Sequence, residues 1–294
     1  MAYGCLTIIV SLMLLLTVMF WIRKVYYMRV KNGIGYFTFA INTDVDYEKC
    51  AMLWGLSLRA TQKHKVKIAV VVNNANTCRD DLHDVFDFVI TKPKRDVVNP
   101  MQYEADLLQL TPFKETIKME CDMLVPCDLS IWMHTFRLKD LTITGHVIDH
   151  KHEKANDDKY RQFIKTNKLP NEYNGLYYVR YTEQNIKFYR ELDRLFVDWD
   201  KEIKKYRLWE RHKPSTDFAM SMALANLNMD SCVVNTPLPT FIHNKKYCVG
   251  DWKHYTVSNA NTIIVNGTRL QYPWHYHNKN LATENLISKY KQYV

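Results

Sequence analysis

The sequence predicts an α/β protein with a doubly wound, mostly parallel sheet, and two observations carry this prediction. Segments with strand-like and helix-like spacing alternate from residue 33 onward. One strand-like segment, residues 67–73 (KIAVVVN), is a continuous apolar run, which is typical of a strand buried on both faces of a parallel sheet. Because doubly wound sheets bind ligands beyond the carboxyl ends of their strands, we expect the functional site at that edge.

In the first half of the chain, expected strands alternate with expected helices. Residues 34–42 (IGYFTFAIN) have the composition of a strand, and residues 46–62 carry apolar side chains at helical spacing. The further strands expected in this half are residues 67–73, 86–91 and 116–119, with a helix at residues 103–110.

The second half contains longer helices and shorter strands. A strand is expected at residues 175–181, and the residues after it, 183–205, have the apolar stripe of an amphipathic helix. The remaining expected elements are a helix at residues 215–226 and short strands at 232–235 and 240–242. The last forty residues are rich in aromatic side chains and are expected to wrap the core. Because no linker or repeat interrupts residues 33–294, we expect one domain there.

Composition excludes several classes of protein. Only 8 of the 294 residues are Gly, and neither the dinucleotide fingerprint nor the P-loop motif occurs. The 7 Cys are odd in number and form no C-x-x-C pair, which indicates free thiols in a reducing compartment. A formal charge of +9 favours a phosphate-bearing partner, namely a nucleotide, a nucleic acid or an anionic membrane surface. A solvated basic surface without such a partner is the alternative.

The N-terminus has the pattern of a membrane anchor. Residues 2–22 carry no charge and are long enough to cross hydrocarbon as a helix. Basic residues follow this segment while no charged side chain precedes it, so we expect residues 1–24 to be a single-pass anchor with the C-terminal domain in the cytoplasm. If translation begins at Met28 instead, the protein is expected to be soluble in the cytoplasm.

An acidic motif follows the strand expected at residues 116–119. Glu120 and Asp122 are separated by one residue, so in an extended chain their carboxylates point to the same side. Carboxylate oxygens at a strand end can hold Mg²⁺ or Mn²⁺, which often complete their coordination with substrate phosphates. Acidic residues that only form a turn are the alternative.

The order of segments over residues 35–246 resembles the GT-A fold of nucleotide-sugar glycosyltransferases, particularly the glycogenin-like and the bacteriophage or large-virus members. The resemblance rests on TFAINTDVDYEKCAMLWGLSLRA, on the Glu120-Cys121-Asp122 motif with its continuation MLVPCDLSIW, and on three later segments. It implies that Asn42, Thr43 and Tyr47 hold the nucleoside. The family's metal motif is Asp-x-Asp, and Glu120 replaces the first Asp here.

The later segments imply further roles. Asn174 and Gly175 correspond to the segment that meets the donor sugar, and Asp217 in KPSTDFAMSMAL to the acidic residue that approaches the sugar or the acceptor hydroxyl. Asp217 also suits the first turn of a helix, where a carboxylate complements the helix dipole. In FIHNKK, His243 is implied as a metal ligand and Lys245 as a ligand of the diphosphate, with a buried core histidine as the alternative for His243. For His275 and His277, a strand or an acceptor-binding wall is expected.

The resemblance thus implies a hexosyl- or pentosyltransferase that uses Mn²⁺ or Mg²⁺ on Glu120, Asp122 and His243. The expected donor is a nucleoside diphosphate sugar, in particular a UDP-sugar, and the expected acceptor is a glycan or a lipid near the membrane. Hydroxymethylated pyrimidines of viral DNA are an alternative acceptor, because a basic enzyme could hold the phosphates while a base is flipped out. A catalytically inactive, membrane-tethered binding protein of the same fold is an alternative of another class. The sequence leaves retention or inversion of the anomeric centre open.

Overall fold

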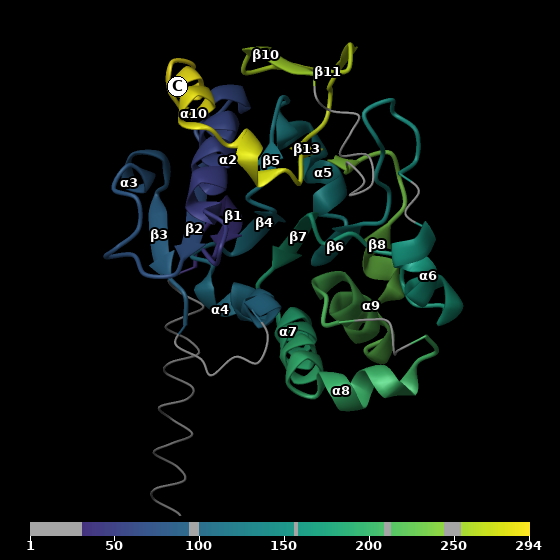
Figure 1. Ribbon diagram of the computed structural model, residues 1–294. Helices are drawn as coiled ribbons and strands as arrows, with labels where there is room; N and C mark the ends of the chain where they lie inside the picture. The colour runs from purple at the N-terminus through teal and green to yellow at the C-terminus, as the bar shows by residue number, and fades with distance from the viewer. Residues whose placement is uncertain (1–30, 94–99, 156–157, 209–212, 244–253) are drawn as a thin grey trace, which may run out of the picture.

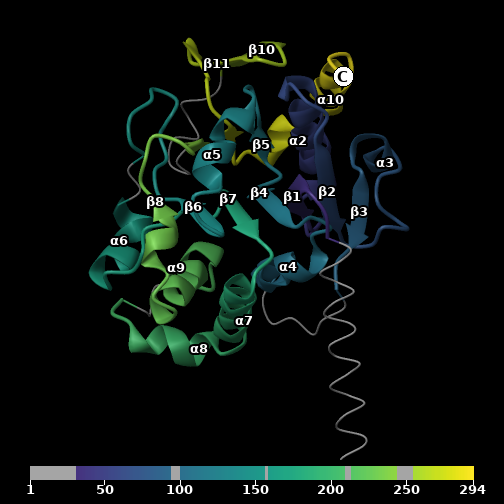
Figure 2. The same cartoon turned by 180° about the vertical axis from the view of Figure 1, so that it is seen from behind.

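The structure is a computed structural model that describes residues 31–93, 100–155, 158–208, 213–243 and 254–294. A seven-stranded sheet in the order β3-β2-β1-β4-β7-β6-β8 forms its centre (Figure 1). Figure 2 shows β3 and the short helix α3 (Leu82–Val85) at one edge, and β8 and α6 (Asp158–Thr166) at the other. The strands are β1 (Ile34–Ala40), β2 (Lys67–Val72), β3 (Phe88–Thr91), β4 (Glu115–Met119), β6 (Leu141–Thr144), β7 (Leu176–Arg180) and β8 (Val233–Val234).

The predicted mostly parallel sheet is confirmed. Strands β1 to β4 pair in parallel, and β6 pairs in parallel with β8. Strand β7 is the exception, because it runs antiparallel to both of its neighbours, β4 and β6. The sequence pattern of β7 could not reveal this, since a fully buried strand reads as apolar in either direction.

Two apolar cores cover the two faces of the sheet. Alternate residues of β1 divide between them, with Tyr36 in one core and Phe37 in the other. The first core is closed by α2 (Tyr47–Thr61) and the second by α7 (Glu183–Val197) and α9 (Thr216–Asn226). Figure 1 shows the same division, with α2 above the sheet and α7 and α9 below it.

Some elements differ from the predictions in extent. The helix expected at 183–205 ends at Val197, because Asp198 has φ −95° and ψ 19°, and the chain continues as α8 (Trp199–Glu202) and η3 (Ile203–Lys205). The helix expected at 103–110 is a 3₁₀ turn, η1 (Pro100–Asp106), followed by α4 (Leu107–Leu110). Elements that the sequence pattern missed include α3, β5 (Met123–Leu124), β6, α6, η2 (Leu129–Trp132), α5 (Met133–Phe136) and η5 (Asp230–Cys232).

The C-terminal segment returns to the centre of the molecule, as its aromatic composition predicted. Strand β13 (Trp274–His275) lies between β5 (Met123–Leu124) and β9 (Ile242–His243) in a small sheet. Trp274, Tyr276 and Tyr290 are fully buried, so this segment is part of the core. Its other elements are β10 (Tyr255–Asn259), β11 (Thr262–Val265), β12 (Thr268–Arg269), η6 (Lys279–Leu281) and α10 (Glu284–Lys291).

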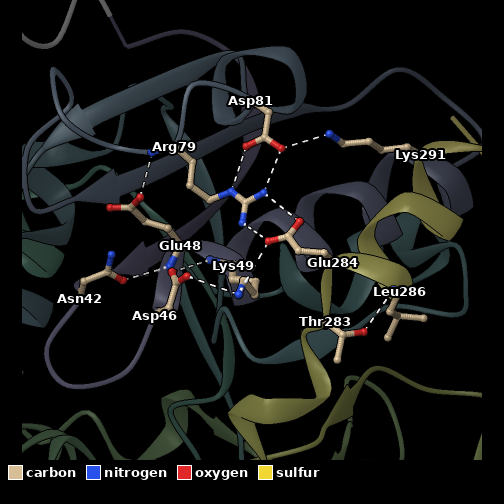
Figure 3. A network of polar contacts seen from close by, with 10 residues as sticks. All are labelled: Asn42, Asp46, Glu48, Lys49, Arg79, Asp81, Thr283, Glu284, Leu286 and Lys291. Atoms are coloured by element: carbon tan, nitrogen blue, oxygen red, sulfur yellow. Dashed lines mark hydrogen bonds and ion pairs between the residues drawn. The ribbon is translucent and has the colours of Figure 1, made fainter.

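A polar network fastens α10 to the beginning of α2 (Figure 3). The Arg79 guanidinium donates to both Asp81 and Glu284, at 2.7–3.2 Å. Lys291 at the end of α10 adds an ion pair with Asp81 (3.0 Å). The backbone N–H of Arg79 in turn donates to Glu48 of α2 (3.0 Å). Charged groups from three distant parts of the chain therefore fix the last helix.

Two predictions concern location. The five Cys of the described ranges are all free, as expected for reduced thiols. The expected single-pass membrane localisation is corrected: within the described ranges, no helix has the length and apolar character needed to span a bilayer. The predicted anchor, residues 1–24, lies outside the described residues.

Candidate active site

The site lies where β4 ends, at the carboxyl edge of the parallel strands. Asp122 follows β4, and its carbonyl accepts a hydrogen bond from the backbone N–H of Tyr276 (3.2 Å). Strand β13 pairs with β5 so that Met123 faces His275. It also pairs with β9, which brings His275 opposite His243. Three segments far apart in the sequence therefore meet beside Asp122.

Asp122 is buried, with a side chain that is 3% exposed. Its Oδ2 accepts a hydrogen bond from His275 Nε2 (3.1 Å) and forms an ion pair with Lys279. Burial alone would raise the pKa of this carboxyl, but the interactions with His275 and Lys279 hold it well below its usual range. Asp122 is therefore ionised, and it raises the pKa of Lys279 to about 12.

Three histidines form a cluster next to Asp122. One ligand nitrogen from each of His243, His275 and His277 lies within 4.8 Å of the other two. His277 Nε2 and His243 Nδ1 are 3.3 Å apart, and the rings of His275 and His277 have centroids 3.7 Å apart. Burial and the neighbouring imidazoles lower the pKa of His277 far below its usual value, so its ring is neutral.

A divalent metal ion fits these donors. Neutral imidazoles and an ionised carboxylate are common ligands of transition metals in proteins. His275 Nδ1 is buried and has no hydrogen-bond partner among the described residues. Such an orphaned buried atom requires an explanation, and a bound ion supplies one.

Glu120, the first acid of the motif, has different partners from Asp122. Its Oε1 lies 2.5 Å from the ammonium of Lys118, a buried residue of β4. The same ammonium lies 3.3 Å from Glu104 and donates to the carbonyl of Asn174 (3.2 Å). Glu120 is therefore paired inside the protein, and its predicted role as a metal ligand stays a prediction.

The residues predicted to hold the nucleoside lie before and at the start of α2. Asn42 accepts hydrogen bonds from the N–H groups of Tyr47 (2.7 Å) and Glu48 (3.1 Å), so its side chain caps the start of α2. Thr43 is exposed and donates to Asp44 (2.8 Å). The ring of Tyr47 is half-buried and lies 5.7 Å from the Lys279 ammonium. Tyr47 thus lies close to Lys279, the partner of Asp122.

The segment predicted to meet the donor sugar is packed against the motif. The carbonyl of Gly175 accepts from the backbone N–H of Glu120 (3.0 Å). A Cβ at Gly175 would lie 2.8 Å from Phe241 and 3.0 Å from Met123, so this close approach requires glycine. The N–H of Asn174 donates to Asp217 (3.2 Å).

Asp217 lies in the first turn of α9, as its sequence context predicted. Its two carboxylate oxygens bind the Asn174 N–H and the Arg161 guanidinium, each at 3.2 Å. Arg161 also stacks on the ring of Tyr173, 3.7 Å from its centroid. Asp217 therefore fixes the Asn174 segment, which connects α9 to the motif.

The sequence analysis expected His275 and His277 in a strand or an acceptor-binding wall, but it did not place them beside Asp122. His275 and His277 alternate with aromatic residues, and this period of two is the signal that both histidines share a face. Lys279 follows at the same spacing. The predicted diphosphate ligand, Lys245, lies outside the described residues.

Comparisons with known proteins identify the fold. No model of a known protein family and no curated protein sequence matches the chain. Among solved structures, mouse xyloside xylosyltransferase 1 is similar with a TM-score of 0.50 and 12% identity, over 84% of this chain and 98% of that one. The galactosyltransferase LgtC, solved with donor and acceptor sugar analogues, has a TM-score of 0.49 and 13% identity, with coverages of 88% and 94%. The likeness to the xylosyltransferase shows a GT-A glycosyltransferase fold, as predicted, while the glycogenin-like and viral subtypes stay a prediction.

Proposed function

We propose that the protein is a glycosyltransferase that moves a sugar from a nucleoside diphosphate sugar to a hydroxyl group of an acceptor. The observation that carries this proposal is the cluster of Asp122, three histidines and Lys279 beside the end of β4. In a doubly wound sheet, that edge is where ligands bind. A leaving diphosphate requires concentrated positive charge, which a metal ion held at the histidines would supply together with Lys279.

The residues of the cluster are proposed to have different roles. A divalent metal held at the histidines beside Asp122, Mn²⁺ or Mg²⁺ in the expected case, would stabilise negative charge on the leaving diphosphate. Lys279 adds a second positive charge close to the same place. Lys245 is proposed as a further diphosphate ligand, as the resemblance implies.

The donor is proposed to lie between α2 and the Asn174 segment. Tyr47 offers a half-buried ring to the nucleobase, which the resemblance implies is uracil. Asn42 supports this contact indirectly, because it caps α2 at Tyr47, and Thr43 is the exposed polar residue next to it. Asn174 and Gly175 would meet the sugar. Because Asp217 binds the Asn174 N–H, we propose that it positions the sugar, while a direct role at the acceptor hydroxyl is a separate prediction.

A donor-hydrolysis assay tests the proposal. Purified protein is incubated with a panel of UDP- and GDP-sugars in the presence of Mn²⁺ or Mg²⁺, and the release of UDP or GDP is measured. Asp122→Asn should reduce turnover at least 100-fold while leaving the fold intact, because it keeps the shape of the side chain and removes its charge. The control is His64→Ala, which replaces an exposed histidine outside the cluster and should retain full turnover. Retention of a tenth of wild-type turnover by Asp122→Asn would contradict the proposal.

The acceptor is proposed to be a glycan. Transfer to a panel of saccharides is compared with transfer to DNA that contains hydroxymethylcytosine. A DNA-directed enzyme loses affinity steeply as salt rises, with a log–log slope of about 0.9 for each neutralised phosphate. Transfer to saccharides with little dependence on salt supports the glycan. Transfer to DNA but not to saccharides, with a strong dependence on salt, would show that the acceptor is a nucleic acid instead of a glycan.

A further inference from the structure

The histidine cluster differs from the metal site that the sequence resemblance implies. That implied site contains the two acids Glu120 and Asp122 with His243 alone. In the structure His243 is instead one of three imidazoles, and the other two, His275 and His277, come from the C-terminal segment. The chemistry of the donors therefore changes from mainly oxygen to mainly nitrogen.

The arrangement has the features of a built metal site. Strands β9 and β13 set His243 and His275 in register, so backbone pairing fixes two of the three rings. All three side chains are partly buried, and one nitrogen of each falls within 4.8 Å of the others. His277 Nε2 and His243 Nδ1 are within hydrogen-bond distance of each other (3.3 Å), and an ion between the three rings would be a ligand partner common to all of them.

His275 connects the cluster to Asp122. Its Nε2 donates to the Asp122 carboxylate (3.1 Å), and its Nδ1 is buried without a hydrogen-bond partner in the described ranges. This is the pattern of a carboxylate–histidine–metal arrangement, in which the carboxylate orients the ring and raises its basicity as a ligand. A metal at the cluster would satisfy the orphaned nitrogen.

Glu120 has a strong internal partner instead. Its carboxylate lies 2.5 Å from the Lys118 ammonium, whose side chain is only 1% exposed. Binding a cation through Glu120 would weaken this pair and bring a second positive charge towards a buried one. The two acids of the motif are thus assigned to different partners.

We propose that His243, His275 and His277 are the metal ligands, with Asp122 orienting His275 and with Glu120 outside the coordination sphere. Three protein ligands leave positions open for diphosphate oxygens, as in catalytic zinc sites. Imidazole favours Zn²⁺ and Co²⁺, whereas Mg²⁺ prefers oxygen ligands. The expected order of affinity is therefore Zn²⁺ above Co²⁺, then Mn²⁺, with Mg²⁺ weakest. This inference deepens the proposed function because it names the metal chemistry of the same site.

Metal binding to the full-length, metal-free protein tests the inference without any sugar donor. Calorimetric titrations with each ion should give at least 100-fold tighter binding of Co²⁺ than of Mg²⁺. The visible absorption of bound Co²⁺ should have the high intensity of a four- or five-coordinate site. Equal affinities for Co²⁺ and Mg²⁺, or the weak absorption of a six-coordinate oxygen site, would overturn the inference.

Variants then identify the ligands. His277→Ala and His243→Ala should each weaken Co²⁺ binding at least tenfold, whereas Glu120→Gln should change it less than threefold. The control is His64→Ala, which removes an exposed histidine. A tenfold loss in Glu120→Gln, or none in the two histidine variants, would overturn the assignment. If a histidine variant fails to fold, the Co²⁺ absorption of the wild type still distinguishes the histidine site from a six-coordinate oxygen site, because it needs no substitution.

The same data separate this inference from the proposed function. Tight, histidine-dependent binding of Co²⁺ without turnover of any donor would reject the glycosyltransferase and keep the metal site. Turnover that depends on Asp122, with equal binding of Mg²⁺ and Co²⁺, would reject only the histidine site.

Discussion

Replacement of Lys118 by Met probes the charge network beneath the site. Lys118 is buried, and its ammonium lies 3.3 Å from Glu104 and 2.5 Å from Glu120. Glu104 is also buried, and its carboxylate accepts a hydrogen bond from the Tyr177 hydroxyl (2.5 Å). Met is similar to Lys in length, so Lys118→Met removes the charge while largely keeping the packing.

The expected cost follows from these distances. At 3.3 Å and an effective dielectric constant of about 20, the attraction between Lys118 and Glu104 is about 5 kcal/mol. Breaking a buried pair by removing one partner typically costs about 3–5 kcal/mol, because the other charge is left without compensation. Glu120 is a third exposed and contributes less, since water can solvate it. We therefore expect Lys118→Met to lower the free energy of unfolding by about 3–5 kcal/mol at pH 8.

The loss should depend on pH in a defined direction. Burial raises the pKa of Glu104 above its ordinary value of 4.5, and Lys118 opposes this rise. Without Lys118 the folded-state pKa rises further, so the folded state binds more protons than the unfolded state above about pH 4.5. Stability of the variant therefore falls as pH rises through the folded-state pKa. The deficit should be smaller at pH 5.5 than at pH 8.

Urea unfolding followed by tryptophan fluorescence measures both effects. The matched control is the double variant Glu104→Gln/Lys118→Met, which replaces both charges and should lie within about 2 kcal/mol of the wild type. An unchanged unfolding midpoint in Lys118→Met would refute the reasoning. So would a deficit that grows towards acid pH.

Two further predictions concern packing around the site. Arg79→Ala should loosen α10, because the guanidinium bonds to Glu284 and Asp81 are lost. Amide hydrogen exchange in α10 should accelerate by roughly fivefold, which corresponds to about 1 kcal/mol, while exchange in the central sheet is unchanged. Equal protection of α10 in both proteins would contradict this. Gly175→Ala should lower the free energy of unfolding by about 1–3 kcal/mol, because the new methyl group meets Phe241 at 2.8 Å. Wild-type thermal stability in that variant would show that the segment can move aside.

Local periodicity was sufficient to predict the parallel half of the sheet. Strands β1 and β2 begin at the predicted residues, and α2 lies within one residue of its predicted bounds at each end. These elements are long and regular, and their ends are marked by recognisable residues. Asp46, for example, caps the start of α2 and accepts a hydrogen bond from the N–H of Lys49 (3.0 Å). Strand β6, with only four residues between turns, offers too short a pattern to separate it from a buried loop.

The candidate site was predicted only in part for a related reason. The acidic motif is local, so its position after β4 could be predicted from neighbouring residues. The partners of its two acids differ: Glu120 pairs with Lys118, two residues before it, while Asp122 binds residues more than 150 positions away. A pattern of alternating residues shows that His275 and His277 share a face, but not which strands lie beside them.

The resulting site depends on the C-terminal segment as much as on the motif. His275 is held between β5 and β9 by backbone pairing, so a shift of one residue in β13 would turn it away from Asp122. Asp122 would then be a buried carboxylate with Lys279 as its main partner, at a cost of several kcal/mol. The register of β13 is therefore stabilised by the same charges that the site uses. Formation of the site therefore requires correct pairing of β13 as well as the acidic motif.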